Sequence, residues 1–195
     1  SFEVFTKNIR TGGIVKAINV KNSQLSRKDI DALIEFVKIY DAKGLAWMKY
    51  GGKALESSVV KFFPEKVQKE LINRLKAEAN DLLLFVSDQK HFIVNTALGQ
   101  LRLKLGKQLG LIDEKKFVFT WVVDFPLIEF DEAEQKHVAV HHPFTSPKDE
   151  DMHLLETHPE KARAKAYDLT VNGAEIGGGS IRIHRSDIQE KIFQI

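Results

Sequence analysis

The stretch Ala166–His184 reads AYDLTVNGAEIGGGSIRIH and decides the fold of the second half of the chain. At its centre, Asn172-Gly173 is the strongest short-range signal for a two-residue β-hairpin turn. The turn predicts three cross-strand pairs: Val171 with Ala174, Thr170 with Glu175, and Asp168 with Gly177. The stretch therefore predicts an antiparallel hairpin with a known register.

The two faces of this hairpin differ in polarity, because side chains alternate faces along a strand and paired residues share a face. One face is apolar and carries Leu169, Val171, Ala174 and Ile176. The other carries Asp168, Thr170 and Glu175. Asp168 and Glu175 become diagonal neighbours, roughly 7–8 Å apart at the backbone. Two carboxylates at that distance repel each other unless a cation lies between them or one of them takes up a proton.

The three glycines that follow predict a β-bulge. Apolar positions are even-numbered before them, at Ala174 and Ile176, and odd-numbered after them, at Ile181 and Ile183. One extra residue in the strand produces that change of face, and glycine is tolerated well in a bulge. With a bulge, the polar face gains three side chains: Ser180, Arg182 and His184. A solvent-exposed sheet face with a glycine kink is the alternative reading.

Composition sets broad limits. The chain has 195 residues, 43% of them hydrophobic, which is enough for one sizeable core or two small ones. A net charge of +2 neither requires nucleic acid nor excludes a local basic patch. Without cysteine there is no disulfide framework and no thiolate zinc site. No apolar run reaches the ~18 residues of a membrane span and no secretory signal is present, so we expect a cytoplasmic protein without membrane contact.

The first part of the chain alternates strand and helix patterns. Three strands are expected, at 14–20, 45–50 and 82–86. Three helices are expected, one after the capping box of Ser26 and Asp29, one from Pro64 to about Ala79, and one from His91 to about Gly110. These elements predict an α+β domain over residues 1–114, in which nothing marks a catalytic centre.

The second part, residues 115–195, is expected to be mainly antiparallel. Two strands, Trp121–Phe130 and His137–His142, flank the polar turn DEAEQK, and a helical stretch is expected at Pro159–Lys165. The chain starts at Ser1 rather than at methionine and stops at Ile195 inside an expected helix. We therefore expect a piece of a longer α+β protein.

Two adjacent histidines precede a loop. Pro143 ends their strand because it cannot donate to a ladder. His141 is then expected at the strand end on the face opposite to His142, beside the loop 144–147. An imidazole at that position can contact a carboxylate, although a purely structural histidine fits the pattern as well. A zinc site is a further alternative, but adjacent histidines on a strand point apart and no third ligand is evident.

Three motifs carry a resemblance to a known family: WVVDFP at 121–126, HHPFTSP at 141–147 and YDLTVNGAEIGGGSIRIH at 167–184. Together they resemble the bacterial type of aspartyl-tRNA synthetase, a class II enzyme, and the resemblance covers essentially the whole chain. The first ~115 residues resemble the GAD domain that this type inserts into its catalytic domain. The remainder resembles part of the antiparallel catalytic sheet with its flanking helices.

The resemblance implies a site for ATP with Mg²⁺ as co-substrate. Asp168 and Glu175 match the acidic pair that holds the magnesium. Three backbone positions match residues near ATP and the adenylate: Gly177, Gly178 and Gly179.

The resemblance also implies a site for L-aspartate. Arg182 matches the arginine that binds the side-chain carboxylate of the substrate, and His141 matches a histidine in a loop that closes over it. His142 and Ser180 are further candidates for this site. No residue is expected to form a covalent intermediate, so none is assigned as a catalytic nucleophile.

The implied activity is that of an aspartate–tRNA ligase, with tRNA as a partner and a homodimeric parent enzyme. The motif for dimerisation and those that hold the rest of ATP are expected outside the chain, so the chain alone is expected to be inactive. One alternative is a non-catalytic GAD module associated with tRNA, as in a subunit of tRNA-dependent amidotransferases. A second is a metal-dependent hydrolase whose ligands would be His141, His142, Asp168 and Glu175.

Overall fold

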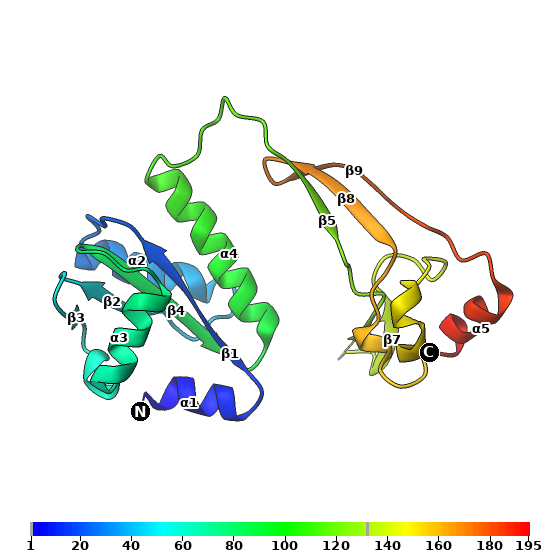
Figure 1. The fold of residues 1–195 in the computed structure, drawn as a ribbon, viewed down its shortest axis with the longest axis horizontal. Coiled ribbons are helices and arrows are strands. Elements are labelled where there is room, and N and C mark those ends of the chain that lie inside the picture. The colour runs from blue at the N-terminus through cyan, green and yellow to red at the C-terminus, as the bar shows by residue number, and fades with distance from the viewer. Residues whose placement is uncertain (1, 132) are drawn as a thin grey trace. The chain divides into compact units, whose positions relative to one another are not determined.

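The computed structural model describes residues 2–131 and 133–195, and the chain divides into two compact units between Asp113 and Glu114 (Figure 1). Both units contain helices and antiparallel strands, so the predicted α+β class is confirmed. Glu132, in the expected turn between Asp131 and Lys136, lies outside the described residues. No helix in the described ranges is both long enough and apolar enough to cross a membrane.

The first unit is built on a four-stranded antiparallel sheet in the order β1-β4-β2-β3. Its strands are β1 (Ile14–Val20), β2 (Ala46–Tyr50), β3 (Leu55–Glu56) and β4 (Asp81–Asp88). Every residue of β4 is buried, as expected for a central strand covered on both faces. The predicted strand at 82–86 is confirmed, and it extends slightly at both ends.

Helices cover both faces of this sheet (Figure 1). On one face, α2 (Arg27–Lys38) and α4 (His91–Gln108) pack over Leu82, Leu84 and Val86. On the other face, α1 (Glu3–Arg10), the 3₁₀ turn η1 (Val60–Phe62) and α3 (Glu65–Arg74) pack over Leu83 and Phe85. Neighbouring residues of β4 face opposite sides of the sheet, and each side packs against a core. Both sets of β4 side chains are therefore apolar, which explains the continuous apolar run.

The ends of these helices follow local chemistry. The capping box predicted at the start of α2 is confirmed: the Ser26 hydroxyl accepts from the Asp29 N–H at 3.3 Å, and Asp29 accepts from the Ser26 N–H at 2.8 Å. α3 starts directly after Pro64, as predicted. It ends at Arg74 rather than near Ala79, because Lys76 and Asn80 take left-handed φ values of 49° and 72° as the chain turns into β4.

The second unit contains a three-stranded antiparallel sheet, in the order β5-β8-β9, and a separate hairpin, β6-β7. The strands are β5 (Phe119–Val123), β6 (Ile128–Asp131), β7 (Lys136–Ala139), β8 (Ala166–Val171) and β9 (Ala174–Ser180). The helical elements are η2 (Asp149–Leu154), η3 (Pro159–Lys161) and α5 (Ser186–Gln194). A small core joins Leu127 and Ile128 to Leu155, Ala164 and Ile192.

Three sequence predictions in this unit are wrong. The single strand expected at Trp121–Phe130 is divided into β5 and β6, because Asp124 adopts a φ of 62° and Pro126 follows it. The strand expected at His137–His142 ends at Ala139, so both histidines lie beyond it. The helix expected at Pro159–Lys165 is limited to η3, after which the backbone is extended and pairs with other segments.

The face of β5-β8-β9 that was expected to be apolar is largely exposed. Phe119, Trp121 and Val123 are exposed on β5, and Ile176 is exposed on β9. The core of the second unit lies instead around β6, η2 and α5.

Candidate substrate-binding site

The register of the β8–β9 hairpin contains the predicted bulge. Two predicted pairs, Val171 with Ala174 and Thr170 with Glu175, are confirmed. The register then shifts, so that Leu169 pairs with Gly177 and Asp168 pairs with Gly178. The predicted pair of Asp168 with Gly177 is therefore wrong by one residue, because the unpaired residue is Ile176, directly before the glycines.

The bulge brings polar residues of β8 and β9 to one face. Paired residues share a face, and so do residues two apart on a strand. Asp168 and Thr170 therefore share a face with Glu175 before the bulge and with Ser180 after it. The prediction that a bulge brings Ser180 to the face of Glu175 is therefore confirmed. Without the extra residue, Ser180 would lie on the opposite face.

Two of the three glycines are in close contact with side chains across the strand pair. A Cβ atom on Gly178 would lie 2.3 Å from Oδ1 of Asp168. A Cβ atom on Gly179 would lie 3.0 Å from the hydroxyl oxygen of Tyr167. A Cβ atom on Gly177 would meet nothing within 4 Å. The glycine run therefore gives the Asp168 carboxylate room to lie directly over the backbone of β9.

The two histidines lie in the loop that follows β7, and both are exposed. The ring of His141 contacts the ring of Phe125 edge-on, with the centroids 4.7 Å apart. The Nδ1 atom of His142 accepts a hydrogen bond from the Phe144 N–H at 3.2 Å. His142 is thus tied to its own loop, while the described residues offer the ring nitrogens of His141 no hydrogen bond.

Backbone pairing places the histidine loop beside the segment that carries Arg182. Thr145 and Arg182 form an antiparallel bridge. On one side of the bridge, the Ser146 N–H donates to the Ile181 carbonyl at 2.8 Å. On the other side, the Ile183 N–H donates to the Phe144 carbonyl at 2.9 Å. The structure therefore brings together the HHPFTSP motif and the end of the glycine motif.

The charged candidates are available to a ligand. Glu175 and Arg182 are exposed and Asp168 is half-buried. Among the described residues, no hydrogen bond or ion pair engages these three side chains. Two carboxylates on one face suit Mg²⁺, which prefers oxygen ligands and takes its remaining ligands from water and substrate phosphates. Within the described residues no three His, Cys, Asp or Glu side chains gather as a metal site.

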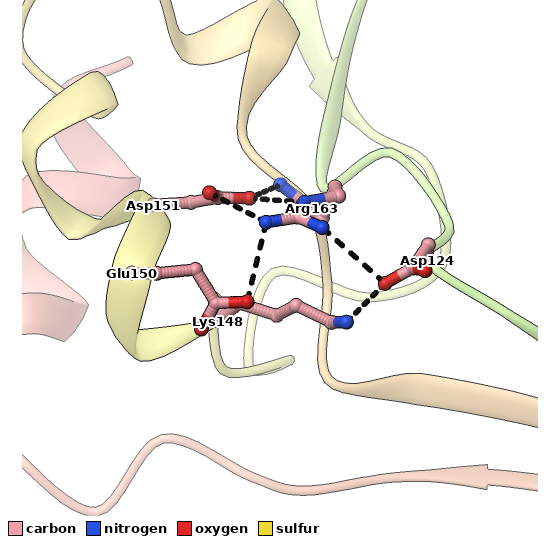
Figure 2. Close-up of polar contacts among 5 residues, drawn as sticks. All are labelled: Asp124, Lys148, Glu150, Asp151 and Arg163. Atoms are coloured by element: carbon pink, nitrogen blue, oxygen red, sulfur yellow. Dashed lines mark hydrogen bonds and ion pairs between the residues drawn. The ribbon is translucent and has the colours of Figure 1, made fainter.

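Figure 2 shows an ion-pair network of the second unit that the sequence did not reveal. We call it the clasp, and its members are Asp124, Lys148, Glu150, Asp151 and Arg163. Arg163 binds Asp151 through two parallel hydrogen bonds, Nε to Oδ2 at 2.7 Å and Nη2 to Oδ1 at 2.9 Å. Nη2 of Arg163 also lies 3.2 Å from Oε1 of Glu150, and Lys148 pairs with Asp124.

The ion pairs of the clasp shift the pKa values of three of its members. The side-chain hydrogen bonds from Arg163 lower the pKa of Asp151 to about 2, and Asp151 in turn raises the pKa of Arg163. The hydrogen bond from Lys148 lowers the pKa of Asp124. Because opposite charges and hydrogen bonds to the ionised form both favour that form, Asp124, Asp151 and Arg163 are charged at neutral pH.

The clasp and the predicted site share a backbone segment. The Lys148 N–H donates to the Arg163 carbonyl at 2.9 Å, and the Lys165 N–H donates to the Ser146 carbonyl at 2.8 Å. Residues 144–148 thus lie between the segment 163–165 and the segment 181–183. The clasp fixes one end of residues 144–148, and Thr145 lies near the other end.

Two cavities of about 500 Å³ and 590 Å³ lie in the first unit, and residues of that unit alone line them. Neither contains a residue that the sequence assigned to a site. The residues predicted for the site all lie in the second unit.

Comparison with known proteins shows that residues 5–98, in the first unit, match the model of the GAD domain family. Along 99% of its length the chain is also 58% identical to the aspartate–tRNA(Asp/Asn) ligases of Bacillus thuringiensis (strain Al Hakam) and Bacillus anthracis. The chain spans 33% of the length of these relatives. The predicted resemblance to aspartyl-tRNA synthetases is thereby confirmed, and the chain is similar to a segment of these ligases.

Proposed function

We propose that this chain is part of an enzyme that activates L-aspartate with ATP and transfers the aspartyl group to tRNA. The observation that carries the proposal is the 58% identity to aspartate–tRNA(Asp/Asn) ligases over 99% of the chain. The aligned length extends over both units, and the residues assigned to the two substrates all lie in the second.

Asp168 and Glu175 would hold the magnesium that accompanies ATP. Bound there, the ion would supply positive charge against the phosphate oxygens. The confirmed bulge supports this role, because Asp168 and Glu175 share one face. The bare backbone of Gly177, Gly178 and Gly179 would let the nucleotide approach closely.

Arg182 would bind the side-chain carboxylate of aspartate. A guanidinium group forms two parallel hydrogen bonds with a carboxylate, which an ammonium group cannot do. Three further residues would complete this part of the site: His141, His142 and Ser180. The bridge between Thr145 and Arg182 supports the proposal, because it brings the histidine loop next to the arginine.

The reaction then follows from positioning. The α-carboxylate of aspartate attacks the α-phosphorus of ATP in line, and pyrophosphate leaves with the bonding electrons. A hydroxyl of the terminal ribose of tRNA next attacks the acyl carbon and AMP leaves. Holding both reactants in line removes much of the entropic barrier, and fixed positive charge stabilises the oxygens on which charge develops. Homodimerisation and cytoplasmic location belong to the same proposal.

The proposal can be tested by ATP–pyrophosphate exchange in a chimera. The 195 residues replace the homologous segment of the full-length ligase of Bacillus cereus (strain AH187), to which the chain is 58% identical. We expect exchange that depends on aspartate. We expect the isolated 195-residue chain to show none. A folded chimera without exchange, or exchange by the isolated chain, would contradict the corresponding part of the proposal.

A non-catalytic GAD module is the second candidate. The match of residues 5–98 to the GAD family favours it for the first unit, which has its own hydrophobic cores. A module of that kind has no need of Arg182 or of the two carboxylates. Retention of full exchange by a chimera that carries Asp168→Asn, Glu175→Gln and Arg182→Gln would support this alternative.

A further inference from the structure

We infer that Thr145 is a positioning residue of the aspartate site, which sets the geometry of Ser180 and of the Arg182 segment through its hydroxyl and backbone. This inference rests on the proposed function for the identity of the ligand. Thr145 belongs to the HHPFTSP motif, but the sequence assigned it no role.

The burial of Thr145 is unusual for a polar residue in a loop. Only 1% of its surface is exposed, whereas His142, Pro143 and Phe144 before it are exposed. Its N–H donates to the His142 carbonyl at 2.9 Å and so closes the turn after the histidines. A buried hydroxyl requires a partner, because an unpaired one loses its hydrogen bonds to water without replacement.

That partner is a residue of the candidate site. The hydroxyl of Thr145 donates to the hydroxyl oxygen of Ser180, with the two oxygens 3.5 Å apart. When Ser180 accepts this hydrogen bond, its own hydrogen is free to donate to an anionic ligand. The distance is long for two hydroxyls, and hydrogen bonds of this kind commonly shorten when the ligand binds.

The backbone of Thr145 acts on the other side of the site. The bridge to Arg182 is flanked by the bonds from Ser146 to Ile181 and from Ile183 to Phe144. One residue therefore contacts three groups assigned to aspartate: the His142 turn, the Ser180 hydroxyl and the Arg182 backbone. The clasp holds the same segment at Lys148, three residues further on.

Substitution of Thr145 by valine separates positioning from a merely structural role. Valine retains the shape and the backbone bonds and removes only the hydroxyl. In the chimera, we expect Thr145→Val to raise the KM for aspartate about 3- to 10-fold, the effect of one hydrogen bond. The KM for ATP and kcat should change less than about twofold, because the lost interaction concerns the binding of one substrate.

Two controls make the result specific. Thr145→Ser keeps the hydroxyl and should restore the KM for aspartate to within about twofold of the unsubstituted chimera. Thr157→Val removes a hydroxyl that donates to the His153 carbonyl at 3.4 Å in the same unit, and should leave both KM values unchanged. Equal increases in both KM values, or no rescue by serine, would show that Thr145 serves the fold alone and would overturn the inference.

A second measurement does not depend on activity. In ¹H–¹⁵N spectra of the 195-residue chain, Thr145→Val should shift the amide signals of Ser180 and Arg182, whereas Thr145→Ser and Thr157→Val should not. If the chimera is inactive but these shifts occur, the proposed function fails and the positioning geometry stands. If Thr145→Val leaves both signals unchanged, the inference is wrong even in an active chimera.

Discussion

The Asp168 carboxylate occupies the space above Gly178, with Oδ1 2.3 Å from where a Cβ atom would lie. We therefore predict that Gly178→Ala forces the carboxylate or the strand pair to move. It should lower the free energy of unfolding of the second unit by about 1–3 kcal/mol, the usual cost of overpacking. Urea denaturation, followed by Trp121 fluorescence in a Trp47→Phe background, measures this change.

Gly177→Ala is the matched control, because nothing lies within 4 Å of its added Cβ atom. Its effect should stay within about 0.5 kcal/mol. Equal losses in the two variants would mean that the glycines serve backbone freedom rather than room for Asp168.

The clasp predicts acid sensitivity of the second unit. Arg163 lowers the pKa of Asp151 in the folded state to about 2, from an ordinary 3.8. Because the folded pKa is the lower one, the stabilisation is fully present above about pH 4 and is lost as the pH falls towards 2. The urea midpoint should therefore fall in that window, and Asp151→Asn should flatten the pH dependence there while lowering stability at pH 7.

Asp149→Asn serves as a control for the clasp. Asp149 pairs with Lys165 at 2.7 Å, but 82% of its side chain is exposed, and exposed pairs contribute little. This variant should keep the acid transition of the unsubstituted chain. An unchanged transition in Asp151→Asn would show that the clasp is not its source.

The central strand of the first unit predicts a large stability effect. Leu84 is 0% exposed and faces α2 and α4. Leu84→Ala removes buried methyl groups and leaves a cavity, so it should cost about 2–5 kcal/mol. Ile39→Ala, at a position that is 72% exposed, should change stability by less than about 0.5 kcal/mol. Thermal unfolding of the first unit, followed by Trp47 fluorescence, distinguishes the two.

Substitution of Arg182 in the chimera should affect the binding of aspartate. Arg182→Lys keeps the positive charge but loses the paired hydrogen bonds to a carboxylate, so the KM for aspartate should rise at least about tenfold. Arg185→Lys is the control, because Arg185 is engaged with Asp187 at 2.6 Å. An equal effect of both substitutions would argue against the role assigned to Arg182.

Local signals in the sequence were sufficient for much of the fold. The Asn172-Gly173 turn, the Ser26 capping box and the apolar run of β4 depend on neighbouring residues alone, and all three are confirmed. The change of parity across the glycines predicted a bulge. Its position at Ile176 was missed, because a change of parity shows that one residue is extra but not which one.

Long-range contacts explain what the sequence did not reveal. The break between β5 and β6 lies at Asp124, which has a left-handed φ and belongs to the clasp. The ion-pair partners of Asp124 lie more than twenty residues further along the chain. The bridge between Thr145 and Arg182 likewise joins distant segments. Neither contact leaves a periodic pattern, so only the shared motif HHPFTSP could have drawn attention to Thr145.

The bulge at Ile176 makes the length of β9 as important as its composition. A substitution in this strand alters one contact, whereas the loss or gain of a single residue between Glu175 and Ser180 would turn every later side chain to the opposite side. We therefore expect natural and engineered variants of this segment to exchange residues while keeping their number constant. Insertions and deletions should be tolerated instead in the turn between β6 and β7, from which none of the assigned residues comes.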